Sequence, residues 1–370
     1  MKYLIYGAGQ TGRGHIPKYL DFAQDQITFV DPLVFLCDML NQVKTFQISF
    51  PQIDKTITVE GYTACLPGSP EEKRALSQAD YVMTAVGAEN LPAAAQGIAA
   101  AFEQQPDREL WVITHENSVD AGALLQRCFD QAHSTVGKVK VAQSAVFCST
   151  IGSEGFGNPL DIVSENQLYY PFEHNKGVAA PPFTHLERID NFDQFLKRKI
   201  YTYNCLSAVI GYLGYLKGYT ILSDAANDPD IVRLVDKLLE QMKPALAAYF
   251  GVNQAAQAEF AQHAVNKFQN RYTVDSIERN IRTPLRKLGP DERIMAPRRI
   301  LKERHRSTEV LELTAAAALR VLQDEQGLDE PSALRHFAEI QRLSTEDETV
   351  RTIGKYLKEV SSGKSISDFL

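Results

Sequence analysis

The chain has 370 residues, of which 44% are hydrophobic and 23% charged, so it can bury at least one full core, and its length suggests two domains. Lys and Arg total 39 against 46 Asp and Glu, a formal charge of −7, which argues against a general nucleic-acid or anionic-membrane binder. The apolar stretches fall short of the ~20 residues that a membrane helix needs, so we expect a soluble protein without a membrane partner.

The first half of the chain alternates short apolar runs with amphipathic stretches. The runs are rich in β-branched and aromatic residues, as is typical of buried parallel strands. They lie at residues 3–6, 27–30, 81–84 and 110–113, and further strand-like runs follow at residues 139–146 and 160–163. This alternation predicts an α/β fold over residues 1–190, with a doubly wound, mostly parallel sheet and helices on both of its faces.

Helical patterns replace the strand-like runs from residue 191 to residue 370. Asp228 and Pro229 form an N-cap with proline at the first helical position, and apolar residues then recur at helical spacing as far as Met242. Similar stretches follow at residues 254–268, 309–322 and 331–340. We therefore expect a mostly α-helical second domain over residues 191–370.

A glycine-rich turn follows the first predicted strand. Residues 7–12 read GAGQTG, a GxGxxG pattern, and a helical stretch is expected to continue through Ile16 to Phe22. The glycines permit a tight turn, close approach of a pyrophosphate to backbone N–H groups and close packing of helix on strand. Asp31 ends the next strand, where a carboxylate accepts hydrogen bonds from the adenosine ribose and repels a 2′-phosphate. The pattern therefore predicts a site for NAD rather than NADP, with an ordinary glycine turn as the alternative. Its residues are Gly7, Ala8, Gly9, Gln10, Thr11, Gly12 and Asp31.

Small and polar residues follow two later strands, at the edge where a parallel sheet binds its ligand. The first strand ends in Thr84, Val86 and Gly87, and the next is followed by His115, Glu116 and Asn117. The first group is placed to border the cofactor, although a strand-to-helix turn would give the same pattern. The second group suggests a site because three polar or ionisable residues stand together, with a solvated loop as the alternative.

The helical half begins with a lysine in largely apolar surroundings. At about 100° per residue, Lys199, Asn204 and Ser207 lie at roughly 0°, 140° and 80° around a helix, so they can converge from one broad face. Desolvation lowers the pKa of a lysine and makes its neutral amine available as a base. From the residues alone, a surface lysine with a packed stem is the favoured interpretation.

Taken together, and in their order along the chain, these motifs resemble those of the polyol-specific long-chain dehydrogenases, the mannitol dehydrogenase family. The resemblance extends from Met1 to about Leu322 and rests on the glycine loop with its Arg13-Gly14 extension, residues 84–87, the Glu116-Asn117 pair, Lys199 with Asn204, and residues 278–288. It implies an N-terminal Rossmann domain, a helical substrate domain, and hydride transfer between a polyol carbon and NAD without a catalytic metal. It also implies a monomer.

The resemblance further implies roles for individual residues. Lys199 matches the general base that takes the hydroxyl proton, Asn204 a residue that holds the reacting oxygen, and Asn117 a second amide that orients or polarises this oxygen. The chain departs from the family pattern at Ser207, where the family has a histidine that holds and tunes the lysine. His115 is the candidate to take over part of that task.

Cationic side chains in the matched segment are candidates for recognising an anionic sugar. They are Arg282, Arg286 and Lys287. A second group follows and includes Arg298, Arg299, Lys302, Arg304, His305 and Arg306. For this second group a solvated helical face is an equally weighted alternative.

We therefore expect an NAD-dependent enzyme that interconverts a polyol phosphate and a ketose phosphate, with D-mannitol 1-phosphate and D-fructose 6-phosphate fitting best. Two alternatives are a related dehydrogenase for another polyol or a sugar acid, and a catalytically silent NAD-binding protein. Five cysteines without a CxxC pair predict neither a disulfide framework nor a metal site. Together with an N-terminus that lacks a secretory pattern, they favour the cytoplasm.

Overall fold

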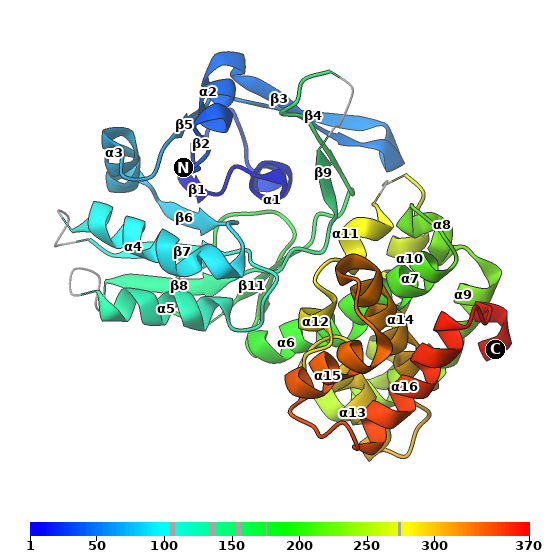
Figure 1. Cartoon of the computed structure of the whole chain (residues 1–370). Helices are drawn as coiled ribbons and strands as arrows, with labels where there is room; N and C mark the ends of the chain where they lie inside the picture. Colours follow the sequence, from blue (N-terminus) through cyan, green and yellow to red (C-terminus); the bar gives the residue numbers. More distant parts are fainter. Residues whose placement is uncertain (104–107, 133–137, 153–156, 175, 273–274) are drawn as a thin grey trace. The chain divides into compact units, whose positions relative to one another are not determined.

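The computed structural model describes residues 1–103, 108–132, 138–152, 157–174, 176–272 and 275–370. It divides into two compact units, Met1–Leu196 and Lys197–Leu370, whose elements are labelled in Figure 1. The division falls inside helix α6 (Phe192–Lys199), whereas the sequence analysis placed the boundary after residue 190. None of the described helices is both long and apolar enough to cross a membrane.

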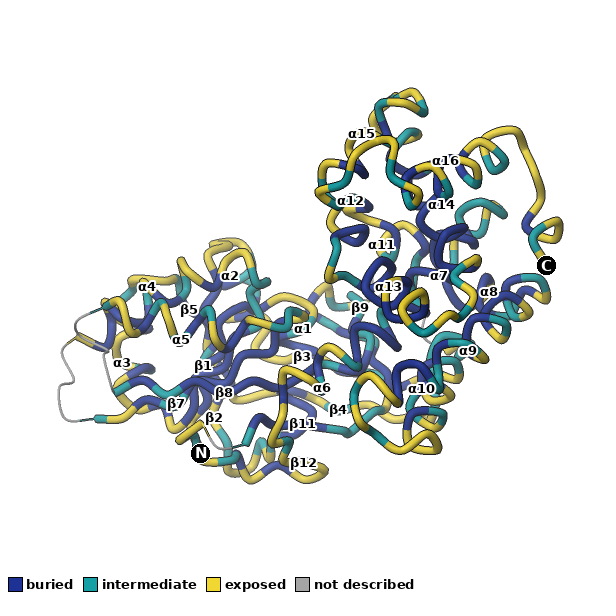
Figure 2. The backbone as a smooth tube through the Cα atoms, turned by 90° about the horizontal axis from the view of Figure 1, so that it is seen from below, coloured by how far each residue is buried: buried dark blue, intermediate teal, exposed yellow. Residues whose placement is uncertain are grey.

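Unit 1 is built around a sheet of six parallel strands in the order β5-β2-β1-β6-β7-β8. Its strands are β1 (Lys2–Tyr6), β2 (Gln26–Val30), β5 (Tyr62–Cys65), β6 (Tyr81–Thr84), β7 (Leu110–Thr114) and β8 (Val139–Gln143). Every residue of β6 is buried, because a parallel sheet is covered on both faces. Figure 2 shows this burial along the central strands. The predicted doubly wound sheet is therefore present.

Different layers cover the two faces of this sheet. One face packs against α3 (Pro70–Gln78), α4 (Leu91–Phe102) and α5 (Ala121–Gln131). The opposite face packs against α1 (Gln10–Gly14), the 3₁₀ turn η1 (Ile16–Tyr19), α2 (Val34–Val43) and further strands. These strands are β3 (Thr45–Phe50), β4 (Lys55–Glu60), β9 (Thr150–Gly152) and β10 (Ile162–Ser164), which form a second sheet, and the parallel pair β11 (Tyr170–Glu173) and β12 (Leu186–Ile189).

The helix after the glycine loop is shorter than the sequence predicts. α1 ends at Gly14, a single 3₁₀ turn follows, and the backbone is extended at Leu20. Pro17 lies in that turn and has no backbone N–H to continue a helical ladder. The expectation of a helix through Phe22 was therefore wrong.

Unit 2 is a helical assembly, as predicted. Its longer helices are α7 (Cys205–Leu216), α9 (Pro229–Phe250), α10 (Gln254–Gln269), α13 (Met295–Glu303), α14 (Glu309–Gln326), α15 (Glu330–Gln341) and α16 (Glu348–Ser361). The short ones are α8 (Leu222–Ala226), α11 (Ile277–Ile281), α12 (Pro284–Lys287) and the 3₁₀ turn η5 (Ile366–Phe369). The Asp228 carboxylate caps α9 by accepting from the N–H groups of Asp230 and Ile231, as its position before Pro229 indicates.

α14 forms the core of unit 2. Every residue from Val310 to Leu319 is buried, and α7, α9, α15 and α16 all pack against this helix. Its alanine-rich middle allows these neighbours to approach closely, and a helix that is buried on all sides belongs in a core.

Candidate active site

The glycine loop of unit 1 is packed on one side and open on the other. Gly7 has φ +93°, and a Cβ atom there would collide with the Ala85 carbonyl. A Cβ atom on Gly12 would collide with the Gly7 carbonyl, whereas one on Gly9 would meet nothing within 4 Å. The loop therefore needs two of its glycines for its own packing. The third, Gly9, leaves the exposed side free for close approach of a ligand.

The residues around this loop are fixed by contacts within unit 1. The Arg13 guanidinium is buried and donates to the carbonyls of Ala8 (2.8 Å) and Leu160 (2.6 Å). The Gln10 amide, oriented to satisfy both of its polar atoms, pairs with the Thr150 carbonyl and the Gly152 N–H of β9. Gln10 thus joins the turn to β9, and Arg13 joins it to the segment that precedes β10. Thr11, the other predicted loop residue, is half-buried at the start of α1.

The Asp31 carboxylate connects the end of β2 to the glycine loop. It accepts from the Ala8 N–H (2.9 Å) and from the Leu33 N–H (2.9 Å), and the residue is only 7% exposed. These bonds place a negative charge beside the turn that starts α1, which is where the ribose-binding prediction needs it.

The carboxyl ends of β1, β6, β7 and β8 lie in register. Thr84 pairs with Tyr6 on one side and with Thr114 on the other, and Thr114 pairs with Gln143. Thr84 is fully buried. The predicted strand-end residues therefore belong to one edge of the sheet.

Glu116 occupies the backbone donors that follow β6. Its carboxylate accepts from the N–H groups of Val86 (2.9 Å) and Gly87 (2.8 Å). Burial raises the pKa of Glu116, and these hydrogen bonds oppose that rise. Glu116 thus holds the Val86-Gly87 turn, and Asn117, the next residue, is exposed at the same sheet edge.

The His115 side chain lies in the interior of unit 1. Its Nε2 is 2.8 Å from the Tyr170 hydroxyl, and its ring meets that of His15 at 5.8 Å. His15 in turn has its Nδ1 3.3 Å from Cys148 Sγ. Burial, reinforced by His15, lowers the pKa of His115 to about 3. A buried, neutral imidazole in such contacts is suited to a structural task within unit 1. That His115 takes over part of the task of holding and tuning the lysine stays a prediction.

In unit 2, Lys199 is buried immediately before a π-helical turn. The turn, η4 (Ile200–Asn204), lies between α6 and α7 and contains the i+5 bond from the Cys205 N–H to the Ile200 carbonyl. A π-turn advances by only about 80° per residue, so Asn204 lies about 40–50° from Lys199 around the axis rather than about 140°. By the same reckoning Ser207 falls within about 20° of Lys199. The three predicted residues therefore share a much narrower face than an α-helix would give them.

Ser207, which stands where the family has a histidine, already has a hydrogen-bond partner. Its hydroxyl donates to the Asn204 carbonyl at 3.1 Å. This bond steadies the backbone of Asn204 but cannot replace an imidazole as a proton carrier.

Two buried cations lie next to α7 in the segment that follows α11. Lys287 donates to the Asn280 carbonyl and lies 5.9 Å from the centre of the Tyr212 ring. Burial, reinforced by Arg293, Arg286 and Arg282, lowers the pKa of Lys287 to about 7. Arg293 is equally buried, and its only ion pair among the described residues is with Glu292 at 3.1 Å. Among the described residues, Glu292 is thus the one carboxylate paired with these two buried cations. Such an excess of positive charge favours a site for an anionic ligand.

Arg293 was missed by the sequence analysis because it stands beside Glu292 and so looks like half of an exposed pair. Arg282 and Arg286, the other predicted anion ligands, are exposed, and Arg286 pairs with Glu292 at 3.2 Å. Between them, Thr283 has φ +55°, an uncommon conformation for a β-branched residue. The sharp turn there separates Arg282 from the helix that carries Lys287.

The second basic group is mostly neutralised within unit 2. Arg298 is buried against Glu312 (2.7 Å), Arg299 pairs with Asp291 (2.9 Å) and Lys302 with Glu348 (2.7 Å). These contacts favour the solvated or structural interpretation of this group over anion binding.

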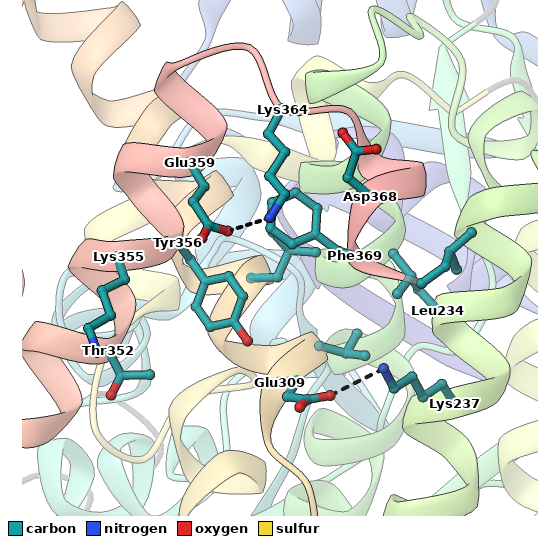
Figure 3. A pocket seen from close by; sticks show the side chains of 13 residues that line it. Leu234, Lys237, Glu309, Thr352, Lys355, Tyr356, Glu359, Lys364, Asp368 and Phe369 are labelled. Carbon is teal, nitrogen blue, oxygen red and sulfur yellow. Dashed lines mark hydrogen bonds and ion pairs between the residues drawn. The ribbon is translucent and has the colours of Figure 1, made fainter.

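A cavity of about 480 Å³ lies elsewhere in unit 2, between α9, α14, α16 and the C-terminal turn η5 (Figure 3). Four of its charged lining residues form ion pairs, since Lys237 contacts Glu309 and Lys364 contacts Glu359, both at 3.1 Å. No predicted site residue lines it.

The chain was then compared with known families. The family model described as the mannitol dehydrogenase Rossmann domain matches residues 1–167, and the model of the mannitol dehydrogenase C-terminal domain matches residues 191–360. Together the two models cover most of both units.

Among individual proteins, the chain is similar to the mannitol-1-phosphate 5-dehydrogenase of Aspergillus niger, with 29% identity over 95% of this chain and 93% of the relative. It is also similar to the enzyme of that name from Halalkalibacterium halodurans, with 27% identity over 88% and 90%. Of the solved structures, Pseudomonas fluorescens mannitol 2-dehydrogenase in complex with NAD and D-mannitol matches 100% of this chain and 93% of that one, at 15% identity and a TM-score of 0.78. A substrate-free D-sorbitol dehydrogenase matches with a TM-score of 0.72 at 14% identity, over 100% of this chain and 94% of that one. These likenesses in structure show a shared fold.

Proposed function

The chain belongs to the mannitol dehydrogenase family, and from this premise we propose that it is an NAD-dependent oxidoreductase that interconverts D-mannitol 1-phosphate and D-fructose 6-phosphate. The names of its curated relatives support this substrate pair. The structural observation that carries the proposal is the π-turn of unit 2, which places Lys199, Asn204 and Ser207 on one face.

The glycine loop fits a dinucleotide. Gly9 is the loop position where an added Cβ would meet no neighbour, while Gly7 and Gly12 are needed for packing. We assign the pyrophosphate to the open side of this loop and the adenosine ribose to Asp31. When bound there, NAD would supply the hydride acceptor and NADH the donor. Thr84, Val86, Gly87 and Asn117 border the same sheet edge and complete the proposed cofactor contacts.

Proton transfer is assigned to Lys199. In the oxidative direction its neutral amine takes the proton of the reacting hydroxyl, and in the reductive direction its ammonium protonates the developing alkoxide. The Asn204 amide donates to the reacting oxygen, so charge that develops on this oxygen meets a donor close to the base along the chain. The family resemblance implies Asn117 as a second amide for the same oxygen. Ser207 steadies Asn204 through its backbone carbonyl.

The phosphate of the substrate is assigned to the cationic segment of unit 2. Lys287 and Arg293 provide buried positive charge, and the exposed guanidinium groups of Arg282 and Arg286 can bind phosphate in bidentate fashion. Burial and, after it, repulsion from the neighbouring arginines lower the pKa of Lys287, and an anion at this position would oppose both effects.

All five cysteines are free thiols, which supports the proposal that the enzyme acts in a reducing cytoplasm. A monomer remains the prediction for its assembly state, and sedimentation of the purified chain tests it.

Steady-state turnover across a substrate panel tests the proposed function. NADH oxidation is followed with D-fructose 6-phosphate, D-fructose and hexuronates, and NAD reduction with D-mannitol 1-phosphate and D-mannitol. We expect the largest kcat/KM for the two phosphorylated compounds. Turnover confined to unphosphorylated sugars or to hexuronates would overturn the substrate assignment, and NADH binding without any turnover would support the silent alternative.

A further inference from the structure

A π-turn interrupts an otherwise continuous helix directly after the proposed base. Such single π-turns are uncommon and often mark functional sites. The shift to i+5 bonding disrupts the regular ladder of i+4 bonds, so a π-turn needs support from side chains outside it. The structure provides this support from one neighbouring helix, α10.

Gln257 of α10 bridges the two ends of the segment that carries Lys199. Its Oε1 accepts from Arg198 Nε at 2.7 Å, and its Nε2 donates to the Thr202 hydroxyl at 3.0 Å. Gln257 is 1% exposed and Thr202 is fully buried. One amide thus spans the chain from the residue before Lys199 to the middle of η4, and buried hydrogen bonds of this kind are costly to break.

A second side chain of α10 holds the same segment by packing. Phe260, one helical turn from Gln257, lies 4.2 Å beneath the Arg198 guanidinium. Its ring also meets that of Tyr203 at 4.9 Å, and Tyr203 belongs to η4. In addition, Arg198 donates to the Ala256 carbonyl at 2.9 Å. Polar and aromatic contacts from α10 therefore restrain residues on both sides of Lys199.

We propose that Gln257 is a positioning residue for catalysis: through Arg198 and Thr202 it maintains the π-turn that keeps Lys199 aligned with Asn204. Without this bridge the segment can relax to a regular α-helix, which moves Asn204 from about 40–50° to about 140° around the axis from Lys199. The Asn204 amide would then no longer reach the reacting oxygen, whereas Lys199 would keep its position. This inference rests on the proposed function of Lys199 as the base.

The test measures turnover of the purified full-length chain with D-fructose 6-phosphate and NADH. Gln257→Leu should lower kcat by about 10- to 100-fold, the cost of a small misplacement of catalytic groups, and leave the KM for NADH unchanged within about twofold. The primary deuterium isotope effect on kcat, measured with NADH labelled on the transferred position, should rise because the chemical step becomes slower. A purely structural role would lower the melting temperature without changing this isotope effect.

Conservative and matched variants complete the test. In Gln257→Glu one carboxylate oxygen accepts from Arg198 and the other accepts from the Thr202 hydroxyl, so the second bond is reversed in direction but the bridge is kept, and most of kcat should return. Thr202→Val removes the bond between Gln257 and Thr202 while keeping the side-chain volume. If Gln257→Leu does not fold, this variant tests the positioning role in its place. Gln262→Leu makes the same change at an exposed position of α10 and should behave as the wild type.

Wild-type kcat and isotope effect in both Gln257→Leu and Thr202→Val would overturn the inference. Lys199→Ala distinguishes this outcome from failure of the proposed function. If Lys199→Ala abolishes turnover while both bridge variants remain active, only the positioning role fails. If Lys199→Ala itself retains turnover, the assignment of the base fails first.

Discussion

A substitution at Gly9 is expected to weaken cofactor binding without changing the stability of the fold. Gly9 has φ −70° and is exposed, and an added Cβ would meet no atom within 4 Å. Alanine can adopt this conformation without strain, so Gly9→Ala should change the free energy of unfolding by no more than about 0.5 kcal/mol. The new methyl group would nevertheless stand on the open side of the loop, where the pyrophosphate is assigned.

Loss of close approach should weaken at least one hydrogen bond from a backbone N–H to a charged phosphate. Such a bond contributes about 1.5–3 kcal/mol, so the Kd for NADH should rise on the order of 10- to 100-fold. Titration of NADH fluorescence measures this Kd, and urea unfolding measures the stability of the same preparation. Both values are needed, because a higher Kd for NADH at an unchanged free energy of unfolding shows that the loop binds the cofactor rather than merely supporting the fold.

Gly97→Ala is the matched control, since Gly97 lies inside α4 and an added Cβ there also meets nothing within 4 Å. It should stabilise the helix by up to about 1 kcal/mol and leave NADH binding unchanged. Gly12→Ala should instead destabilise the fold strongly, because its Cβ would collide with the Gly7 carbonyl. Unchanged NADH affinity in a folded Gly9→Ala variant would refute the assignment of the pyrophosphate to this loop.

Three further predictions concern charged groups. Asp31→Asn keeps an acceptor for the N–H groups of Ala8 and Leu33 but removes the negative charge, so the ratio of kcat/KM for NADH over NADPH should fall; an unchanged ratio would contradict the assignment. Because the pKa of Lys287 is about 7, its positive charge is present below pH 7 and lost above it. The kcat/KM for D-fructose 6-phosphate should therefore decline between pH 7 and 9, and Lys287→Met should flatten this decline; an equal decline in both proteins would refute the role of Lys287. His115 has a folded-state pKa of about 3 against about 6.5 when unfolded, so the stability it contributes is complete above pH 6.5 and lost as the pH falls toward 3. Between pH 7 and pH 5 the wild type should lose about 2 kcal/mol more than His115→Gln in urea unfolding, and parallel curves would contradict the neutral, buried state.

The parallel sheet was predictable because its strands are buried on both faces and so stand out as short, continuous apolar runs. Of the second sheet, only β10 coincides with a predicted strand-like run, at residues 160–163; its other strands were missed, although part of their signal is present. β3 alternates buried Phe46, Ile48 and Phe50 with more exposed residues, which is the period-2 pattern of a half-buried strand. Its partner β4 has a weaker alternation, with Val59 as its buried residue. β5, at the edge of the parallel sheet, was missed as well, because the exposed Thr63 interrupts its short apolar run.

The site was predictable where its chemistry is local in sequence. The glycine loop and Asp31 need only a strand, a turn and a second strand in order, and the structure places them together. The alignment of Lys199 with Asn204 was not predictable, because a regular helical period was assumed, and Gln257, which contacts the π-turn through Thr202, lies 55 residues further along the chain. The inward orientation of His115 depends equally on distant partners, since Tyr170 lies on another strand.

The most direct test of the account follows the hydride itself. NADH deuterated at the transferred position is incubated with D-fructose 6-phosphate and the wild-type chain, and the product is examined by NMR. The account predicts a sugar-alcohol phosphate with deuterium on the former carbonyl carbon, formed by the wild type and not by Lys199→Ala. Equal deuterium transfer by Lys199→Ala, or no transfer by a wild-type chain that binds NADH, would contradict it.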